Sequence, residues 1–201
     1  MTTKSISSAQ DVYQIKVTLL WTKPPIWRRL LVPSLMTFEQ LHYVLQTAMG
    51  WDNSHMHEFS VAKRRIGEPE PSDGFAGFTD MSPADDESTA RICDVLKRAG
   101  AKMTYTYDFG DSWEHSIVLE KRLPPDQNTV YPTCLDGQLA CPPEDCGGIP
   151  GFYRLVDILA HPKHKEHGEM REWVGDNYNP EAFSVDKVNK LLAPKHRPRK
   201  K

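Results

Sequence analysis

An alternation of apolar and polar residues near the start of the chain places the strictest constraint on its fold. Between residues 12 and 21, apolar side chains alternate with polar ones, and the apolar ones are Tyr13, Ile15, Val17, Leu19 and Trp21. A period of two over such a stretch is typical of a β-strand that buries one face and exposes the other. Because one strand cannot bury its apolar face alone, the sequence predicts a sheet that another layer covers.

Two further strands are expected close to the first one in the chain. The string Lys23-Pro24-Pro25 ends the first strand, and Ile26 to Val32 predicts the second. These two strands should pair antiparallel, since a short turn cannot serve a parallel crossover. The stretch His55 to Val61 alternates again and predicts a third strand.

A helix is predicted between Thr37 and Gly50. Thr37 and Gln40 have the spacing of a capping box, and Gly50 is suited to the left-handed residue that follows a last helical turn. An apolar stripe at helical spacing connects these two signals, and it consists of Phe38, Leu41, Leu45 and Ala48. Shorter helices are expected at residues 92–99, 152–160, 163–174 and 185–192.

The stretch Lys102 to Glu120 predicts a β-hairpin whose register follows from its pattern. Its apolar residues fall on one face when the connecting loop has an odd number of residues, three or five. In the three-residue form, Asp108 would lie directly opposite Glu114. Like charges in that position destabilise a sheet unless a cation or a raised carboxylate pKa neutralises them.

Proline and glycine mark the boundaries of these elements. Proline accounts for 16 of the 201 residues, and residues 63–88 and 124–151 lack any period that could bury a face. We therefore expect long Pro/Gly-rich loops in both stretches. The fold class expected from all of these signals is α+β, with an antiparallel sheet and helices packed on it. A single domain at residues 11–192 should lie between flexible tails at 1–10 and 193–201.

Composition and the ends of the chain narrow the class of protein further. Hydrophobic residues make up 39% and charged residues 26%, which is usual for a globular domain and excludes wholesale disorder, collagen and coiled coils. The first ten residues show no secretory signal, and no stretch approaches the ~20 apolar residues of a membrane helix. A cytoplasmic protein without a membrane partner is expected.

Two pairs of residues give the sharpest metal-site hypothesis. His55 and His57 are two positions apart on an expected strand, so both imidazoles would project from one face. Asp108 and Asp111 lie near the hairpin tip and could complete a nitrogen and oxygen site for a divalent metal. The alternative interpretation makes these histidines hydrogen-bonded members of the rim of the core.

Other clusters suggest ligand-facing positions. Glu114 and His115 lie at the same hairpin tip, and Glu144 and Asp145 lie in a loop whose glycines allow close approach of a partner. A zinc site of thiolates is a further alternative, although its spacing lacks the usual close cysteine pair. Its ligands would be Cys134, Cys141 and Cys146.

A basic arm at the end of the chain is the sequence feature that could contact nucleic acid. Its five cations could neutralise phosphates, or they could simply keep the terminus soluble. The residues are Lys195, Arg197, Arg199, Lys200 and Lys201.

Four strings in order along the chain resemble the plasmid pRiA4b ORF-3-like family, named from an open reading frame on a root-inducing plasmid. The strings are Lys23 to Arg29, Met49 to Asp52 followed by His55 to Phe59, Tyr105 to His115, and Cys141 to Gly151. The resemblance covers residues 11 to 192 and implies a compact α+β domain.

Some members of that family carry a transposon-resolvase label. A resolvase needs a Ser or Tyr nucleophile beside clustered arginines, and here Ser5, Ser7 and Ser8 lie in a polar tail. Resolvase activity is therefore disfavoured. The function expected is that of a non-catalytic binding or accessory protein linked to plasmids or mobile elements, with an unknown protein or small-molecule partner. The alternative is a metal-dependent hydrolase.

Overall fold

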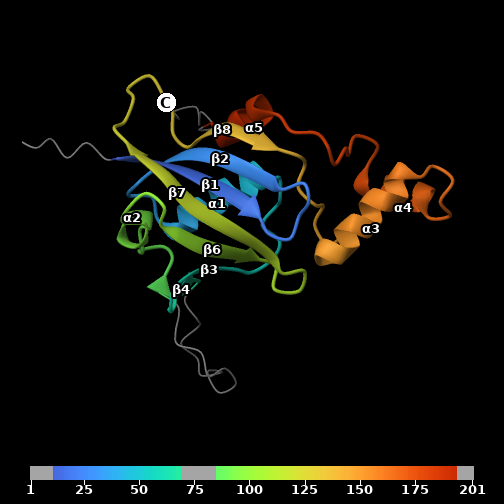
Figure 1. Ribbon diagram of the computed structural model, residues 1–201, viewed down its shortest axis with the longest axis horizontal. Coiled ribbons are helices and arrows are strands. Elements are labelled where there is room, and N and C mark those ends of the chain that lie inside the picture. Colours follow the sequence, from blue (N-terminus) through green and yellow to red (C-terminus); the bar gives the residue numbers. More distant parts are fainter. Residues whose placement is uncertain (1–10, 69–84, 194–201) are drawn as a thin grey trace, which may run out of the picture.

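The computed structural model describes residues 11–68 and 85–193, and within them the chain forms one eight-stranded sheet (Figure 1). The strand order is β5-β4-β3-β6-β7-β1-β2-β8, and every neighbouring pair is antiparallel except β4 and β5. The strands are β1 Val12–Leu19, β2 Ile26–Pro33, β3 His57–Val61, β4 Arg64–Gly67, β5 Asp85–Asp86, β6 Lys102–Tyr107, β7 Trp113–Leu123 and β8 Thr133–Gln138. The α+β class and the antiparallel pairing of the first two strands are confirmed.

Helices cover one face of the sheet and extend from one of its ends. They are α1 Phe38–Met49, α2 Ile92–Val95, α3 Gly148–Ala160, α4 His167–Val174 and α5 Val185–Leu192. Figure 1 shows α1 behind the sheet, α5 beside β8, and α3 with α4 projecting beyond the strands. None of these helices combines the length and apolarity needed to cross a membrane.

The first helix forms as its local signals predict. The Thr37 hydroxyl accepts from the Gln40 backbone N–H at 3.2 Å, and the Gln40 side chain accepts from the Thr37 N–H at 3.1 Å. Gly50 ends the helix with a φ of 101°. Phe38 and Leu41 are fully buried against the sheet, and each such side chain contributes roughly 1.5–3 kcal/mol.

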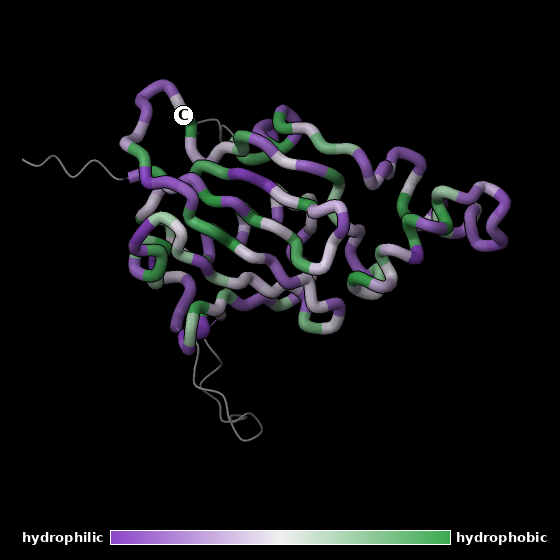
Figure 2. Tube along the Cα trace, viewed as in Figure 1, coloured by the Kyte–Doolittle hydropathy of each residue, from purple (hydrophilic) through white to green (hydrophobic). Residues whose placement is uncertain are grey.

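The alternation predicted for the strands appears as alternating colour along the sheet in Figure 2. In β6 and the first eight residues of β7, every second side chain is buried, and Tyr105, Tyr107 and Trp113 are completely buried. All three belong to the core cluster, and the Tyr105 hydroxyl bonds to His42 and Gln46 of α1. The buried face of this hairpin is therefore the apolar face that the sequence alternation predicts.

The hairpin between β6 and β7 has the longer of the two expected loops. Tyr107 pairs with Trp113, so the loop spans the five residues 108–112. Thr106, and not Asp108, lies opposite Glu114. The three-residue alternative, in which Asp108 would lie opposite Glu114, does not form, because Asp108 leaves the ladder with a φ of 55° and begins the loop.

Several element boundaries differ from the sequence expectation. The stretches 63–88 and 124–151 were expected to contain only loops, yet β4, β5 and β8 form there. These strands lie toward the two edges of the sheet, where ladder hydrogen bonds can form without an apolar period. The helix expected at 92–99 ends at Val95, and α4 begins at His167. Residues 1–10, 69–84 and 194–201 lie outside the described residues.

Candidate functional site

Two loops that are distant in the sequence meet at the end of the sheet from which α3 extends. The Asp111 carboxylate in the hairpin loop accepts a hydrogen bond from the Gly147 N–H at 3.0 Å. The next residue, Gly148, has a φ of 65°, and a Cβ there would lie 2.8 Å from the Asp111 carbonyl oxygen. Glycine is therefore required at this close approach of two backbones.

Replacing Gly148 with alanine should destabilise the protein by about 2 kcal/mol or more. The cost has two sources, a left-handed backbone that disfavours a Cβ and a contact with a backbone oxygen that must move. Urea unfolding of Gly148→Ala measures the loss. Gly168→Ala is the matched control, because nothing lies within 4 Å of its added Cβ. Equal stability of the two variants would contradict this close approach.

Three carboxylates converge on the His55 imidazole beside this contact. His55 Nε2 lies 3.0 Å from Asp145 Oδ1, 3.7 Å from Asp108 Oδ2 and 3.9 Å from Glu144 Oε2. One ligand atom each from His55, Asp108 and Asp145 can be chosen so that all lie within 4.8 Å of one another. In the described part of the chain, the ion pairs of these three carboxylates all involve His55.

Asp108 is held in place by its own loop. Its side chain is 10% exposed, and Oδ1 accepts from the Gly110 N–H at 2.9 Å and the Asp111 N–H at 3.3 Å. These bonds use one carboxylate oxygen and leave Oδ2 directed at His55. Aspartate tolerates the left-handed φ of 55° at this position because its short side chain bonds locally.

Glu144 connects the second loop to the sheet and to the segment after α1. Its Oε1 accepts from the Asp52 N–H at 3.0 Å and from the Tyr107 hydroxyl at 3.1 Å. Burial raises the pKa of the Glu144 carboxyl above its ordinary value. The Tyr107 hydroxyl in turn accepts from the Ser54 N–H at 3.0 Å, which fixes the residues leading to His55.

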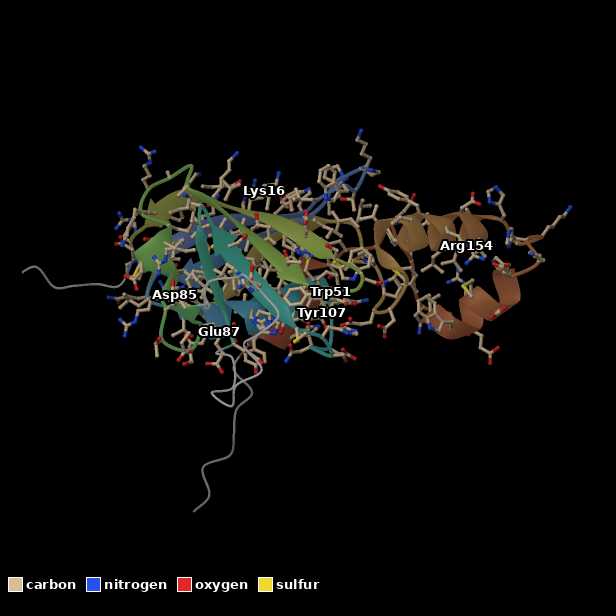
Figure 3. The ribbon with its side chains drawn as sticks, turned by 90° about the horizontal axis from the view of Figure 1, so that it is seen from below. Lys16, Trp51, Asp85, Glu87, Tyr107 and Arg154 are labelled. Carbon is tan, nitrogen blue, oxygen red and sulfur yellow. The ribbon has the colours of Figure 1, made fainter. Side chains whose placement is uncertain are left out.

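Packed aromatic rings support the cluster of His55 and its carboxylates. Trp51 stacks on Tyr107 with ring centroids 5.0 Å apart, and its Nε1 donates to the Pro142 carbonyl oxygen at 2.9 Å. Figure 3 shows the two labelled rings together near the end of the sheet from which α3 extends, with Glu87 farther from that end. The site is therefore built on a packed core and is not carried by loops alone.

The arrangement offers one nitrogen and several oxygens around a common point. Nε2 of His55 is a buried atom that makes no hydrogen bond to any described residue. An imidazole with two or three carboxylates is a ligand set that Zn²⁺ and Mn²⁺ accept. A cation between these groups would also remove the repulsion among the carboxylates.

Two of the four predicted metal ligands lie in this group and two lie elsewhere. His55 and Asp108 are together, whereas Asp111 bonds to Gly147. His57 Nε2 lies 2.7 Å from Glu87 Oε2, and its ring stacks on His42 at 3.5 Å. The two imidazoles have different partners, because His57 is the first residue of β3 while His55 lies in the loop before it, where strand alternation does not apply.

Of the four predicted ligand-facing residues, two lie beside His55 and two do not. Glu144 and Asp145 lie beside His55, and Asp145 was not foreseen as a metal ligand because its distance from the hairpin is not readable from sequence. Glu114 accepts from Trp21 Nε1 at 3.3 Å. His115 does not face a ligand, since its side chain is completely buried.

The remaining expectations concern the cysteines and the basic arm. The metal-ligand group found in the described residues contains no cysteine. Burial raises the pKa of Cys141 and of Cys146 to about 12, which disfavours the thiolate form that zinc binds. The basic arm, Lys195 to Lys201, lies outside the described residues.

Comparisons with known proteins agree with the fold and name no activity. A family model described as plasmid pRiA4b ORF-3-like protein matches residues 11–187. The uncharacterized protein y4hQ of Sinorhizobium fredii is 37% identical over 183 residues, which cover 90% of this chain and 91% of the relative. The crystal structure of a protein of unknown function, MM3350 of Methanosarcina mazei Go1, superposes with a TM-score of 0.78 at 35% identity. That match covers 89% of this chain and 97% of the solved one.

Proposed function

The chain belongs to the plasmid pRiA4b ORF-3-like family, and from its geometry we propose that it is a binding protein for a divalent metal ion. The ion would be held by His55, Asp108 and Asp145. The observation that carries the proposal is the convergence of these three ligand atoms from three separate segments. Each segment is anchored by bonds of its own to the sheet or to a neighbouring loop.

The separations of the ligand atoms suit a transition metal. Ligands about 2.1 Å from a tetrahedral ion lie roughly 3.4 Å apart. The distances from His55 Nε2 to the two aspartates, 3.0 and 3.7 Å, bracket this value. An imidazole nitrogen favours Zn²⁺ or Mn²⁺ over Ca²⁺ and Mg²⁺, which prefer oxygen ligands.

Beyond holding an ion, the site is suited to an accessory role with a partner. The family takes its name from a plasmid open reading frame, which supports an accessory role for a plasmid or other mobile element in the cytoplasm. The Asp145 side chain is 70% exposed, so the ion would be reachable by a partner from solvent. A protein or small-molecule partner with an oxygen donor could occupy an open coordination position.

Metal titration of the purified full chain tests the proposal. We expect one equivalent of Zn²⁺ or Mn²⁺ to bind per chain by calorimetry, and Ca²⁺ and Mg²⁺ to bind at least about tenfold more weakly. Elemental analysis before chelation gives an independent count. If neither Zn²⁺ nor Mn²⁺ binds saturably, the proposed function is refuted.

A metal-dependent hydrolase is the second candidate, and the position of Glu144 favours it. Its carboxylate lies 3.9 Å from His55 Nε2, and burial raises its pKa, so Glu144 would serve as a general base beside an ion that His55, Asp108 and Asp145 would hold. Turnover of nitrophenyl esters or phosphodiesters by the metal-loaded protein, lost in Glu144→Gln, would favour the hydrolase. Stoichiometric metal binding without turnover would favour the binding protein.

A further inference from the structure

A cavity lies apart from the carboxylate cluster, where the end of α1, the helix α5 and residues 140–143 meet. Its volume is about 420 Å³, which is in the range of small-molecule sites. Much of the lining is apolar and includes Met49, Pro142, Phe183 and Val188. Nothing in the proposed metal site depends on this cavity.

A buried arginine lines the cavity with part of its hydrogen-bonding capacity unused. Arg28 on β2 is 2% exposed. Its Nε donates to the Ala48 carbonyl at 2.8 Å, and its Nη1 donates to the carbonyls of Trp27 and Gln138 at 2.8 and 3.0 Å. Its Nη2 makes no hydrogen bond within residues 11–68 and 85–193. The two N–H groups of Arg28 Nη2 therefore have no acceptor among the described residues.

The charge of Arg28 is not balanced by any carboxylate in the described residues. None of the ion pairs among the described residues includes Arg28, and burial lowers the pKa of its guanidinium from the ordinary value. Phe183 lies over the guanidinium, with its ring centroid 4.2 Å from Cζ. A buried charge without a counterion is destabilising, and an anion bound in the cavity would offset that cost.

The remaining charge around the cavity has the same sign. Lys187 on α5 is the other charged residue in the described lining, which contains no aspartate or glutamate. The Lys187 N–H is satisfied by the Ser184 hydroxyl at 3.3 Å, and its side chain is exposed at the surface. Two cations and no anion, in a chain of net charge −2, give the cavity a positive potential.

We propose that this cavity binds a small organic carboxylate with an apolar body. The carboxylate would accept from Arg28 Nη2, and the apolar body would lie against Met49, Pro142 and Val188. A singly charged group fits better than a phosphate monoester, because Arg28 offers one free nitrogen and a dianion needs more donors. The cation at Lys187 would attract the ligand toward the cavity.

Binding of hexanoate, compared with 1-hexanol, tests the proposal on the unaltered full chain. We expect saturable binding of hexanoate by calorimetry and binding of the alcohol at least about tenfold weaker, because the alcohol forms no charge-assisted hydrogen bond. Amide resonances of Phe183 and Val188 should shift in nitrogen-edited NMR spectra. Equal affinities, absent binding, or shifts confined to residues elsewhere would overturn the proposal.

Variants separate the role of charge from the integrity of the fold. Arg28→Gln should abolish hexanoate binding, and circular dichroism shows whether this variant folds. Lys187→Gln is expected to weaken binding about two- to fivefold, since its charge is exposed and screened. Lys190→Gln on the same helix is the matched control, because Lys190 does not line the cavity. Identical affinities of the two lysine variants would contradict the proposed site.

Discussion

Lowering the pH from 7 to 4 is expected to destabilise the folded protein by several kcal/mol through two buried histidines. His115 is completely buried, and burial lowers its pKa to about 4. His42 is 2% exposed, and burial, followed by the neighbouring charge of His57, lowers its pKa to about 4 as well. In the unfolded chain both groups titrate near 6.5.

The direction of the effect follows from where the proton binds more tightly. Between pH 6.5 and about 4, the unfolded chain carries protons on these imidazoles that the folded protein excludes. The stability that the neutral imidazoles provide is complete above pH 6.5 and is lost as the pH falls toward 4. Each histidine accounts for about 3 kcal/mol over this window.

Urea unfolding at several pH values, repeated with His115→Leu, measures this contribution. The variant lacks one of the two proton acceptors, so its stability should change less steeply with pH than that of the unaltered protein. His161→Leu is the control, because His161 is 65% exposed and lies at the end of α3. A pH dependence unchanged by His115→Leu would show that His115 does not cause the acid sensitivity.

The Asp108→Asn substitution is expected to weaken binding of the proposed metal ion by about 100-fold or more. Replacing a group that merely orients a ligand costs about 10- to 100-fold in affinity, and loss of a ligand should cost at least as much. An asparagine oxygen can still accept from the Gly110 and Asp111 N–H groups that Asp108 Oδ1 binds. The amide nitrogen that replaces Oδ2 cannot bind the ion, so the fold should survive while the site is lost.

Titration with Zn²⁺ against a competing chelator gives the affinity of each variant. Asp126→Asn provides a matched control, because Asp126 also accepts from a local backbone N–H, that of Asn128 at 3.1 Å, and lies in another loop. Its affinity for the ion should equal that of the unaltered chain. If Asp108→Asn binds as tightly as the control, Asp108 is not a ligand.

The two proposed sites share one segment of the chain. Residues 142 and 143 line the cavity, and the next two residues, Glu144 and Asp145, face His55. Trp51 and Asp52 hold this segment from α1, through bonds to Pro142 and Glu144 at 2.9 and 3.0 Å. A rigid loop dense in proline thus separates an apolar cavity from a polar cluster.

Much of the fold was predictable because its signals are local. The Thr37 and Gln40 side chains cap a helix through bonds that span three residues, so neighbouring residues suffice to place its start. Alternation likewise indicates the buried face of β7 over its first eight residues, whereas the first four residues of β1 are buried on both faces. Two of the three proposed ligands, His55 and Asp108, were predictable because they are ligand-type residues in segments with clear structural signals.

By itself, the sequence determined the α+β class, the first helix and the odd length of the hairpin loop. Each of these depends on contacts between near neighbours or on a strict period. Only the tertiary structure decided that the loop has five residues, that His57 bonds to Glu87 and that Asp145 meets His55. The physical reason is that contacts between residues 30 or 90 positions apart depend on how the sheet and its loops pack, and no local pattern records that packing.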